Sequence, residues 1–248
     1  MRIAALYDIH GNLPALEAVL KEIRLADVHL VVVGGDILPG PMPRETLESL
    51  LELEIPVRFI KGNCENDAFA ETRGIGEVRF PEQVKESMHW SAEQIFSEYE
   101  QLVYEWPDTL SLEVDGFGRV LFCHATPRDD NEIFTRLTPE ESVLPIFEET
   151  GAAMVVCGHT HMQFDRTIGH VRVINAGSVG MPFGKPGAYW LLLDGDVKLQ
   201  RTMYDLSDAA ARIRQTHYPE AYDFAEKSVL HPPTEQQMLD VFSKAELR

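Results

Sequence analysis

Seven side chains of types that commonly bind metal ions occur in five short fragments, each directly after an apolar run. The fragments are Asp8-Ile9-His10, Gly35-Asp36, Gly62-Asn63-Cys64-Glu65, His124 and Gly158-His159-Thr160-His161. Short apolar runs bounded by Gly, Asn or Asp are typical of buried strands. Because sites in open α/β sheets form beyond the carboxyl ends of strands, we expect two Asp, one Asn and four His to meet at one edge. The sequence therefore predicts a metal site.

The ligand types indicate which metals this site would bind. Carboxylate, amide oxygen and imidazole without thiolate suit Mn, Fe, Zn, Ni or Co. Seven ligands are too many for one tetrahedral site, whereas two divalent metal ions that share one carboxylate would use them all. Two ions about 3.5–4 Å apart form a common arrangement for in-line displacement at phosphorus. Each fragment alone can be an ordinary turn or a satisfied polar residue, so the prediction depends on all five together.

The elements that must position these fragments can be predicted from periodicity. Apolar residues recur at helical spacing over residues 13–23, and a second helix is expected over residues 44–53, after a loop stiffened by Pro39, Pro41 and Pro43. Strands alternating with these helices indicate a parallel sheet. Residues 65–106 are predicted to be helical, with Val84, Met88, Ile95, Tyr99 and Leu102 facing inward.

The second half of the chain has a different pattern. Turn sequences at residues 115–118, 169–170 and 194–196 separate pairs of apolar runs, which is typical of β-hairpins. Residues 206–248 are predicted to form helices broken at Pro219 and at Pro232-Pro233.

The order of the five fragments resembles the calcineurin-like metallophosphoesterase superfamily, and more closely its compact bacterial and archaeal phosphodiesterase branch. Supporting stretches are residues 7–16, 34–36 with Gly40-Pro41, 124–129 and 175–180. The resemblance implies a four-layer α/β/β/α sandwich of two mainly mixed β-sheets with flanking helices. We expect a metallophosphoesterase domain over residues 1–205, with a helical insertion at about 65–106 that either overhangs the cleft or packs peripherally. Residues 206–248 would form a helical C-terminal extension packed on the same domain.

The resemblance also implies a role for each fragment. Asp8, His10 and His161 would hold one ion, Asn63, His124 and His159 would hold the other, and Asp36 would bridge both together with a hydroxide. The implied catalytic residues are Asp36, Asn63, Cys64 and His124. The implied activity is hydrolysis of small or nucleotide-like phosphodiesters.

Cys64 departs from the pattern of this family, which usually has histidine after the Gly-Asn pair. A thiol with an ordinary pKa of about 8.5 is mostly neutral at pH 7 and supplies no imidazolium charge to a leaving oxygen. One interpretation is a preference for diesters or good leaving groups, and the other is a weakened site.

Two other functions compete with the phosphodiesterase. A phosphomonoesterase or nucleotide phosphatase would usually carry Asp-Arg-Gly after the Gly-Asp fragment, where this chain has Ile37-Leu38-Pro39-Gly40-Pro41 without that arginine. The histidine that such enzymes would have at position 64 is also missing. A non-catalytic metal-binding scaffold is disfavoured because all seven ligands are present.

Two further residues are candidates for substrate binding. Arg128 could contact a phosphate with its planar guanidinium, and pairing with Asp129 or Asp130 is the alternative. Asn12 could contact phosphate, although capping of the first helix explains it equally well.

Composition limits the partners of the chain. With 40 acidic and 22 basic residues, the net charge is −18, which disfavours long nucleic acid and leaves a small phosphorylated substrate. We expect no signal peptide and no membrane span, and three cysteines indicate a reducing, cytoplasmic setting. The tail is a candidate surface for a homo-oligomer.

Overall fold

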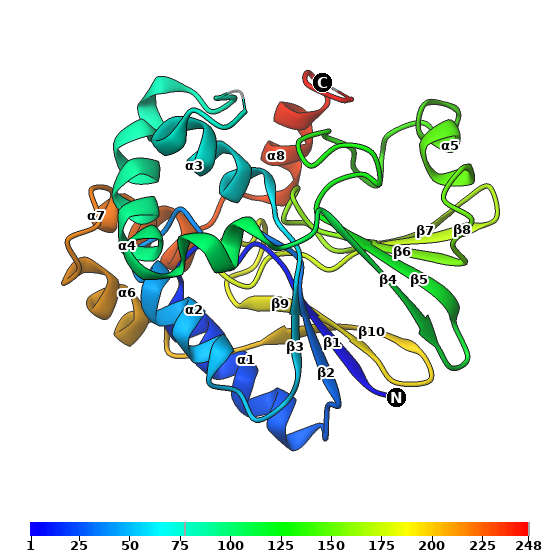
Figure 1. The fold of residues 1–248 in the computed structure, drawn as a ribbon, viewed down its shortest axis with the longest axis horizontal. Coiled ribbons are helices and arrows are strands. Elements are labelled where there is room, and N and C mark those ends of the chain that lie inside the picture. The colour runs from blue at the N-terminus through cyan, green and yellow to red at the C-terminus, as the bar shows by residue number, and fades with distance from the viewer. Residues whose placement is uncertain (77, 248) are drawn as a thin grey trace.

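Two five-stranded sheets pack face to face in the computed structural model, which describes residues 1–76 and 78–247 (Figure 1). The first sheet has the order β10-β9-β1-β2-β3. Strands β1 to β3 are parallel to one another, β9 pairs antiparallel with β1, and β10 pairs antiparallel with β9. Its strands are β1 (Ile3–Leu6), β2 (Leu30–Val33), β3 (Val57–Phe59), β9 (Ala188–Leu193) and β10 (Val197–Thr202).

The second sheet has the order β4-β5-β6-β8-β7. Strands β5, β6 and β8 are parallel, and the two edge strands pair antiparallel to their neighbours. The strands are β4 (Thr109–Val114), β5 (Gly118–Cys123), β6 (Met154–Cys157), β7 (Phe164–Ile168) and β8 (Val171–Asn175). Both sheets are therefore mixed.

Alternation along the strands divides the core into layers. Ile3 and Ala5 face the second sheet and share one buried cluster with Phe122 and Val156, whereas Leu6 faces outward into a cluster with the helices. Successive side chains of a strand point to opposite faces, so one strand supplies both clusters. A third cluster covers the outer face of the second sheet. The predicted four-layer α/β/β/α arrangement is confirmed.

Helices α1 (Leu13–Leu25) and α2 (Pro43–Leu51) cover the outer face of the first sheet, and α5 (Glu140–Glu148) covers the second (Figure 1). The expected start of the second helix was one residue late, and Pro43 is its first residue rather than part of the loop. Proline suits this position because its missing N–H would have no partner inside the helix and its φ is already helical.

The segment predicted as an insertion, about 65–106, contains a short 3₁₀ turn η1 (Glu82–Val84), α4 (Lys85–Tyr104) and all but the first two residues of α3 (Asn63–Arg73). The predicted inward position of Leu102 is wrong, since its exposed fraction is 38%, and the neighbouring Val103 is buried instead. Residue 103 rather than 102 continues the face on which Met88 and Ile95 pack.

The tail contains α6 (Leu206–Arg214), α7 (Ala221–Phe224), a π-helical turn η2 (Ala225–Leu230) and α8 (Glu235–Phe242). Its buried cluster includes Ile213, Tyr218 and Phe224, and Trp90 of α4 and Met181 pack against that cluster. The tail thus packs against the insertion and the loop that follows β8. Across the described ranges 1–76 and 78–247, no helix is both long and apolar enough to cross a membrane.

Candidate metal centre

The structure brings the seven side chains together where β1, β2, β3, β5 and β6 end. A first group consists of Asp8, His10 and His161. Nε2 of His161 lies 3.3 Å from Nε2 of His10 and 3.4 Å from Oδ1 of Asp8. All three side chains are at least nine-tenths buried. This geometry gives one carboxylate and two imidazoles around a common point.

A second group consists of Asn63, His124 and His159. Oδ1 of Asn63 lies 2.9 Å from Nε2 of His124 and 3.0 Å from Nδ1 of His159. The groups are adjacent, because Nε2 of His124 is also 3.8 Å from Oδ1 of Asp8.

Asp36 lies between the two groups. Its Oδ2 is 3.8 Å from Nε2 of His10 in the first group and 3.5 Å from Nε2 of His124 in the second. A single carboxylate oxygen thus faces both sets of imidazole nitrogens, which is the position that a bridging ligand needs.

All four imidazoles place a backbone carbonyl against the ring nitrogen that points away from the centre. The pairs are His10 Nδ1 with Pro39 at 3.2 Å, His124 Nδ1 with Gly34 at 2.8 Å, His161 Nδ1 with Met181 at 2.7 Å and His159 Nε2 with Asn131 at 3.2 Å. A carbonyl only accepts hydrogen bonds, so each outer nitrogen carries the hydrogen. In the neutral ring, the inner nitrogen then presents its lone pair to the centre, as a metal ligand must.

This ligand set fits a cation because, with neutral rings, the inner atoms of the seven side chains are all acceptors. Oδ1 of Asp8 is buried and has no hydrogen-bond partner among the residues that the structure describes. The inner nitrogens of His10 and His161 face one another with lone pairs. Buried polar groups without partners are costly, and a cation between them would satisfy all of them at once.

Several candidate ligands have an unfavourable backbone conformation, which is typical of functional sites. Five of the seven non-glycine residues with positive φ, among those the structure describes, belong to the candidate ligand set: Asp8, His10, Asp36, His159 and His161. Left-handed backbone is unfavourable for side chains other than glycine, and it concentrates at functional sites.

Glycine at position 62 is required by the close approach of Asp36. A Cβ at this position would lie 2.1 Å from Oδ1 of Asp36, which no side chain can tolerate. The Gly-Asn fragment therefore uses its glycine to let the two loops touch.

Glu65 joins those two loops from within. Its carboxylate accepts hydrogen bonds from the backbone N–H groups of Asp36, Ile37 and Gly62 at 2.7–2.9 Å. Burial, together with the charge of Asp36, raises the pKa of Glu65 to about 7. Sequence reasoning included Glu65 in its fragment without giving it a role, and the structure shows that it positions Asp36.

Cys64 also contacts Asp36. Its thiol donates a hydrogen bond to Oδ2 at 3.0 Å, and its backbone N–H donates to Oδ1 at 3.0 Å. Burial, reinforced by the charge of Asp36, raises the pKa of this thiol well above its ordinary value. The side chain is therefore a neutral donor to Asp36.

The centre attracts positive charge. Burial opposes protonation of His124, but the carboxylate of Asp36 outweighs it and raises the pKa of His124 to about 10. Burial lowers the pKa of His159 to about 4, and the nearby His124 contributes. The carboxylates thus favour positive charge at the centre, which divalent ions would supply.

The two predicted substrate contacts lie outside the centre. Asn12 is fully buried, where its side chain accepts a hydrogen bond from the N–H of Ala15 at 3.2 Å and donates one to the carbonyl of Gly180 at 2.9 Å. These contacts favour the helix-capping alternative for Asn12, and its contact with a phosphate stays a prediction. Arg128 pairs with Glu132 rather than with Asp129 or Asp130.

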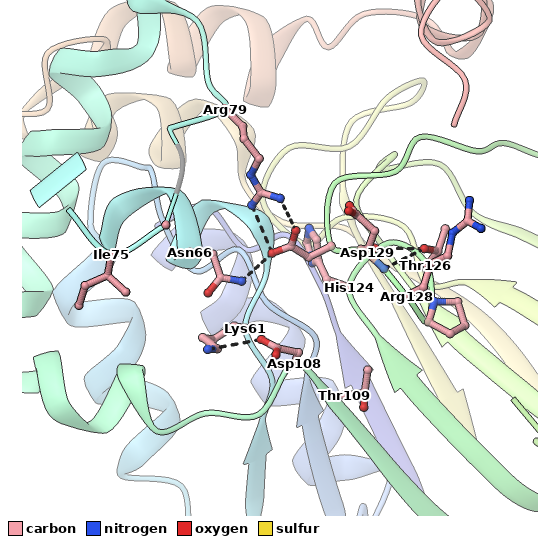
Figure 2. Close-up of a pocket in the computed structure, with 13 residues that line it drawn as sticks. Lys61, Asn66, Ile75, Arg79, Asp108, Thr109, His124, Thr126, Arg128 and Asp129 are labelled. Carbon is pink, nitrogen blue, oxygen red and sulfur yellow. Dashed lines mark hydrogen bonds and ion pairs between the residues drawn. The ribbon is translucent and has the colours of Figure 1, made fainter. Parts of the chain in front are cut away.

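Arg79 was missed by sequence reasoning and lies close to the centre. Figure 2 shows Arg79 reaching from the insertion toward the loop that follows His124, with Asn66 pointing toward the same place. Its guanidinium lies 2.8 Å from Asp67 and 2.6 Å from Asp130. Asn66 donates to Asp130 at 2.6 Å. This cluster holds the insertion against the second sheet, and no sequence spacing indicates it.

Asn175 and Ser178 support the ligand loops from behind. Asn175 donates to the carbonyl of Gly158 at 2.5 Å, and Ser178 donates to the carbonyl of Asp8 at 2.7 Å. The turn after β8 thereby fixes the loops that carry the first and last fragments.

Comparison with known proteins identifies the family. Residues 1–197 match the calcineurin-like phosphoesterase superfamily domain. An uncharacterized protein of Methanocaldococcus jannaschii is 26% identical over 238 residues, covering 88% of this chain and 94% of that protein. Phosphodiesterase YfcE of Escherichia coli is 25% identical over 206 residues, covering 79% of this chain and 89% of the enzyme.

A solved structure points the same way. A metallophosphoesterase from Sphaerobacter thermophilus is 26% identical with a TM-score of 0.70, covering 92% of this chain and 100% of that one.

Proposed function

Because the chain belongs to the calcineurin-like phosphoesterase superfamily, we propose that it is a dinuclear metal-dependent phosphodiesterase acting on small or nucleotide-like phosphodiesters. The observation that carries this proposal is the position of Asp36, one oxygen of which faces imidazole nitrogens of both groups. A centre for one ion would not need a carboxylate in that place.

The proposed ligands follow the two groups. Asp8, His10 and His161 would hold one ion, Asn63, His124 and His159 the other, and Asp36 both. Mn, Fe, Zn, Ni or Co suits these oxygen and nitrogen donors. When bound, the ions would supply Lewis acidity that activates water and offsets negative charge on the phosphate.

The side chains of the centre support hydrolysis by water. Cys64 is a poor nucleophile because its thiol is neutral and donates to Asp36. Arg79 pairs with Asp67 and Asp130 rather than standing free for a substrate phosphate. The protein would therefore position the substrate and neutralise the charge on its phosphate, rather than form a covalent intermediate.

Preference for diesters rests on Cys64 and on the relatives. No imidazolium stands at position 64 to protonate a leaving oxygen, so substrates with good leaving groups are favoured. Phosphodiesterase YfcE is among the relatives of this chain.

Three buried, unpaired cysteines support the proposal of a reducing, cytoplasmic setting.

Hydrolysis assays test the proposal. Protein stripped with a chelator and reloaded with Mn²⁺ should hydrolyse bis(4-nitrophenyl) phosphate with a higher kcat/KM than 4-nitrophenyl phosphate. A preference for the monoester would instead support a phosphomonoesterase. Absence of turnover with each of the five metals would support a scaffold.

A further inference from the structure

A cavity of about 470 Å³ opens on the candidate metal centre. One side is formed by the centre itself, through Asp36, Asn63, Cys64 and three of the four imidazoles. Its volume falls within the range of ordinary small-molecule sites. A substrate phosphate at the metals would therefore extend one of its ester groups into this cavity.

An apolar wall of this cavity comes from three separate parts of the chain. Phe80, Val84 and Met88 belong to the insertion, Met181 to the loop after β8, and Tyr218 and Phe224 to the tail. Aromatic rings and thioether sulfurs pack favourably on the face or edge of another ring.

The aromatic part of this wall is held in place. The ring of Tyr218 packs edge-on against Trp90 with centroids 5.6 Å apart, and against Phe224 at 6.2 Å. Tyr218 and Phe224 are each only 6% exposed. A wall that is already ordered can bind a ring without losing side-chain freedom.

The charges at the cavity disfavour a second phosphate group. Apart from histidine, Lys227 is its one basic residue within the described ranges, and its Nζ lies 2.6 Å from Oδ2 of Asp223. Asp67 and Glu220 add further negative charge. A phosphate or carboxylate located away from the metals would have no free cation to pair with.

We propose that this cavity binds an uncharged aromatic ring carried by one ester group of the substrate. The inference rests on the proposed function and narrows the substrate to phosphodiesters with an aryl group or a nucleobase. Nucleoside polyphosphates and sugar bisphosphates are disfavoured, because they would place a second anion beside Asp67, Glu220 and the paired Lys227.

Calorimetry with phosphonates of increasing size tests the inference on the metal-loaded protein. Phenylphosphonate should bind at least about tenfold more tightly than methylphosphonate, since burial of a ring contributes roughly that much. Phenylphosphonate should also bind more tightly than hexylphosphonate. The 4-carboxyphenylphosphonate should lose the gain in affinity that the phenyl compound has over the methyl compound. Thymidine 5′-monophosphate separates the two sources of the ring: tighter binding than phenylphosphonate identifies a nucleobase, and weaker binding an aryl group.

Equal affinity for the methyl and phenyl compounds would overturn the inference, and so would tighter binding of the hexyl compound, which would indicate an alkyl chain. If bis(4-nitrophenyl) phosphate is hydrolysed in either case, the proposed function stands without the inference. If no metal supports any hydrolysis, both fail.

A pair of variants locates the binding site. Val84→Lys places a cation in the wall and should weaken phenylphosphonate binding at least about fivefold while improving binding of the 4-carboxyphenyl compound. Leu102→Lys is the matched control, because Leu102 is 38% exposed on the same insertion and does not line the cavity. Met181→Lys repeats the test from another segment if the first variant fails to fold. Unchanged binding in both wall variants would contradict the assignment.

Discussion

The Cys64 thiol donates a hydrogen bond to Oδ2 of Asp36, the same oxygen that faces imidazole nitrogens of both ligand groups. The residue that departs from the family pattern is thus in direct contact with the proposed bridging ligand. Its contribution is a neutral hydrogen bond, and it brings no positive charge to the cavity.

Replacing Cys64 with histidine should change the choice of substrate. Because a general acid contributes about 10²–10⁴ in rate, Cys64→His should raise monoester relative to diester hydrolysis by at least about tenfold. Cys64→Ser retains a neutral donor and should leave the ratio unchanged. The measurement is kcat/KM for 4-nitrophenyl phosphate, phenyl phosphate and bis(4-nitrophenyl) phosphate, and an unchanged ratio in Cys64→His would remove this position from the specificity argument.

Removal of metal should lower stability through the same aspartate. A ligand at a hundred times its Kd stabilises the folded state by about 2.7 kcal/mol, so Mn²⁺ should measurably raise the unfolding temperature of the wild type. Asp36→Asn should lose most of this metal-dependent gain and at least about a hundredfold in diester hydrolysis. Thermal unfolding with and without metal measures the first effect. A full metal-dependent shift in Asp36→Asn would show that the ions bind elsewhere.

A single methyl group at position 62 should disrupt the centre. In Gly62→Ala, the new Cβ would meet Oδ1 of Asp36 at 2.1 Å, so the aspartate must move and metal content should fall. Gly74→Ala is the control, since nothing lies within 4 Å of its added Cβ. That control has φ of +67° and should cost about 1 kcal/mol in stability without changing metal content. Equal metal content in both variants would contradict the close-approach argument.

Loss of Arg79 should destabilise the protein in a pH-dependent way. Asp67 is 2% exposed, and burial already raises its pKa despite the hydrogen bond from Arg79. Arg79→Gln leaves Asp67 and Asp130 facing one another without a cation, at a cost of about 1–3 kcal/mol because the site is partly solvated.

The direction of this pH dependence follows from protonation of the two carboxyl groups. Without Arg79, the folded pKa of Asp67 rises further and that of Asp130 loses the lowering that Arg79 gives it, so the lost stability returns as the two groups protonate. The deficit in unfolding free energy should be full at about pH 8 and shrink as the pH falls toward the ordinary aspartate value of 3.8. Arg73→Gln, which breaks the exposed pair with Glu100, should change stability much less than Arg79→Gln does. A deficit that does not vary with pH would argue against charge as its cause.

Much of the fold could be predicted because strands and hairpins leave local signals. The apolar runs that precede Asp8, Asp36 and His124 are the strands β1, β2 and β5, and the turn at Gly169 joins β7 to β8. Since the carboxyl ends of these strands share one region, the spacing indicated which side chains meet. Their role as metal ligands stays a prediction.

Other features carry no local signal. Arg79 meets Asp130 across 51 residues, and the wall of the cavity combines side chains from the insertion and the tail. The buried face of α4 was misjudged at Leu102, because periodicity alone does not define which edge of a helix contacts its neighbours. Asn12 shows the same limit, since capping and phosphate binding use the same amide group.

Counting metal ions per chain tests the central claim most directly. Native mass spectrometry of the folded protein, titrated with Mn²⁺ or Zn²⁺, should show two ions bound at saturation. Saturation at a single ion, or at none, would contradict the account of two ligand groups joined by Asp36.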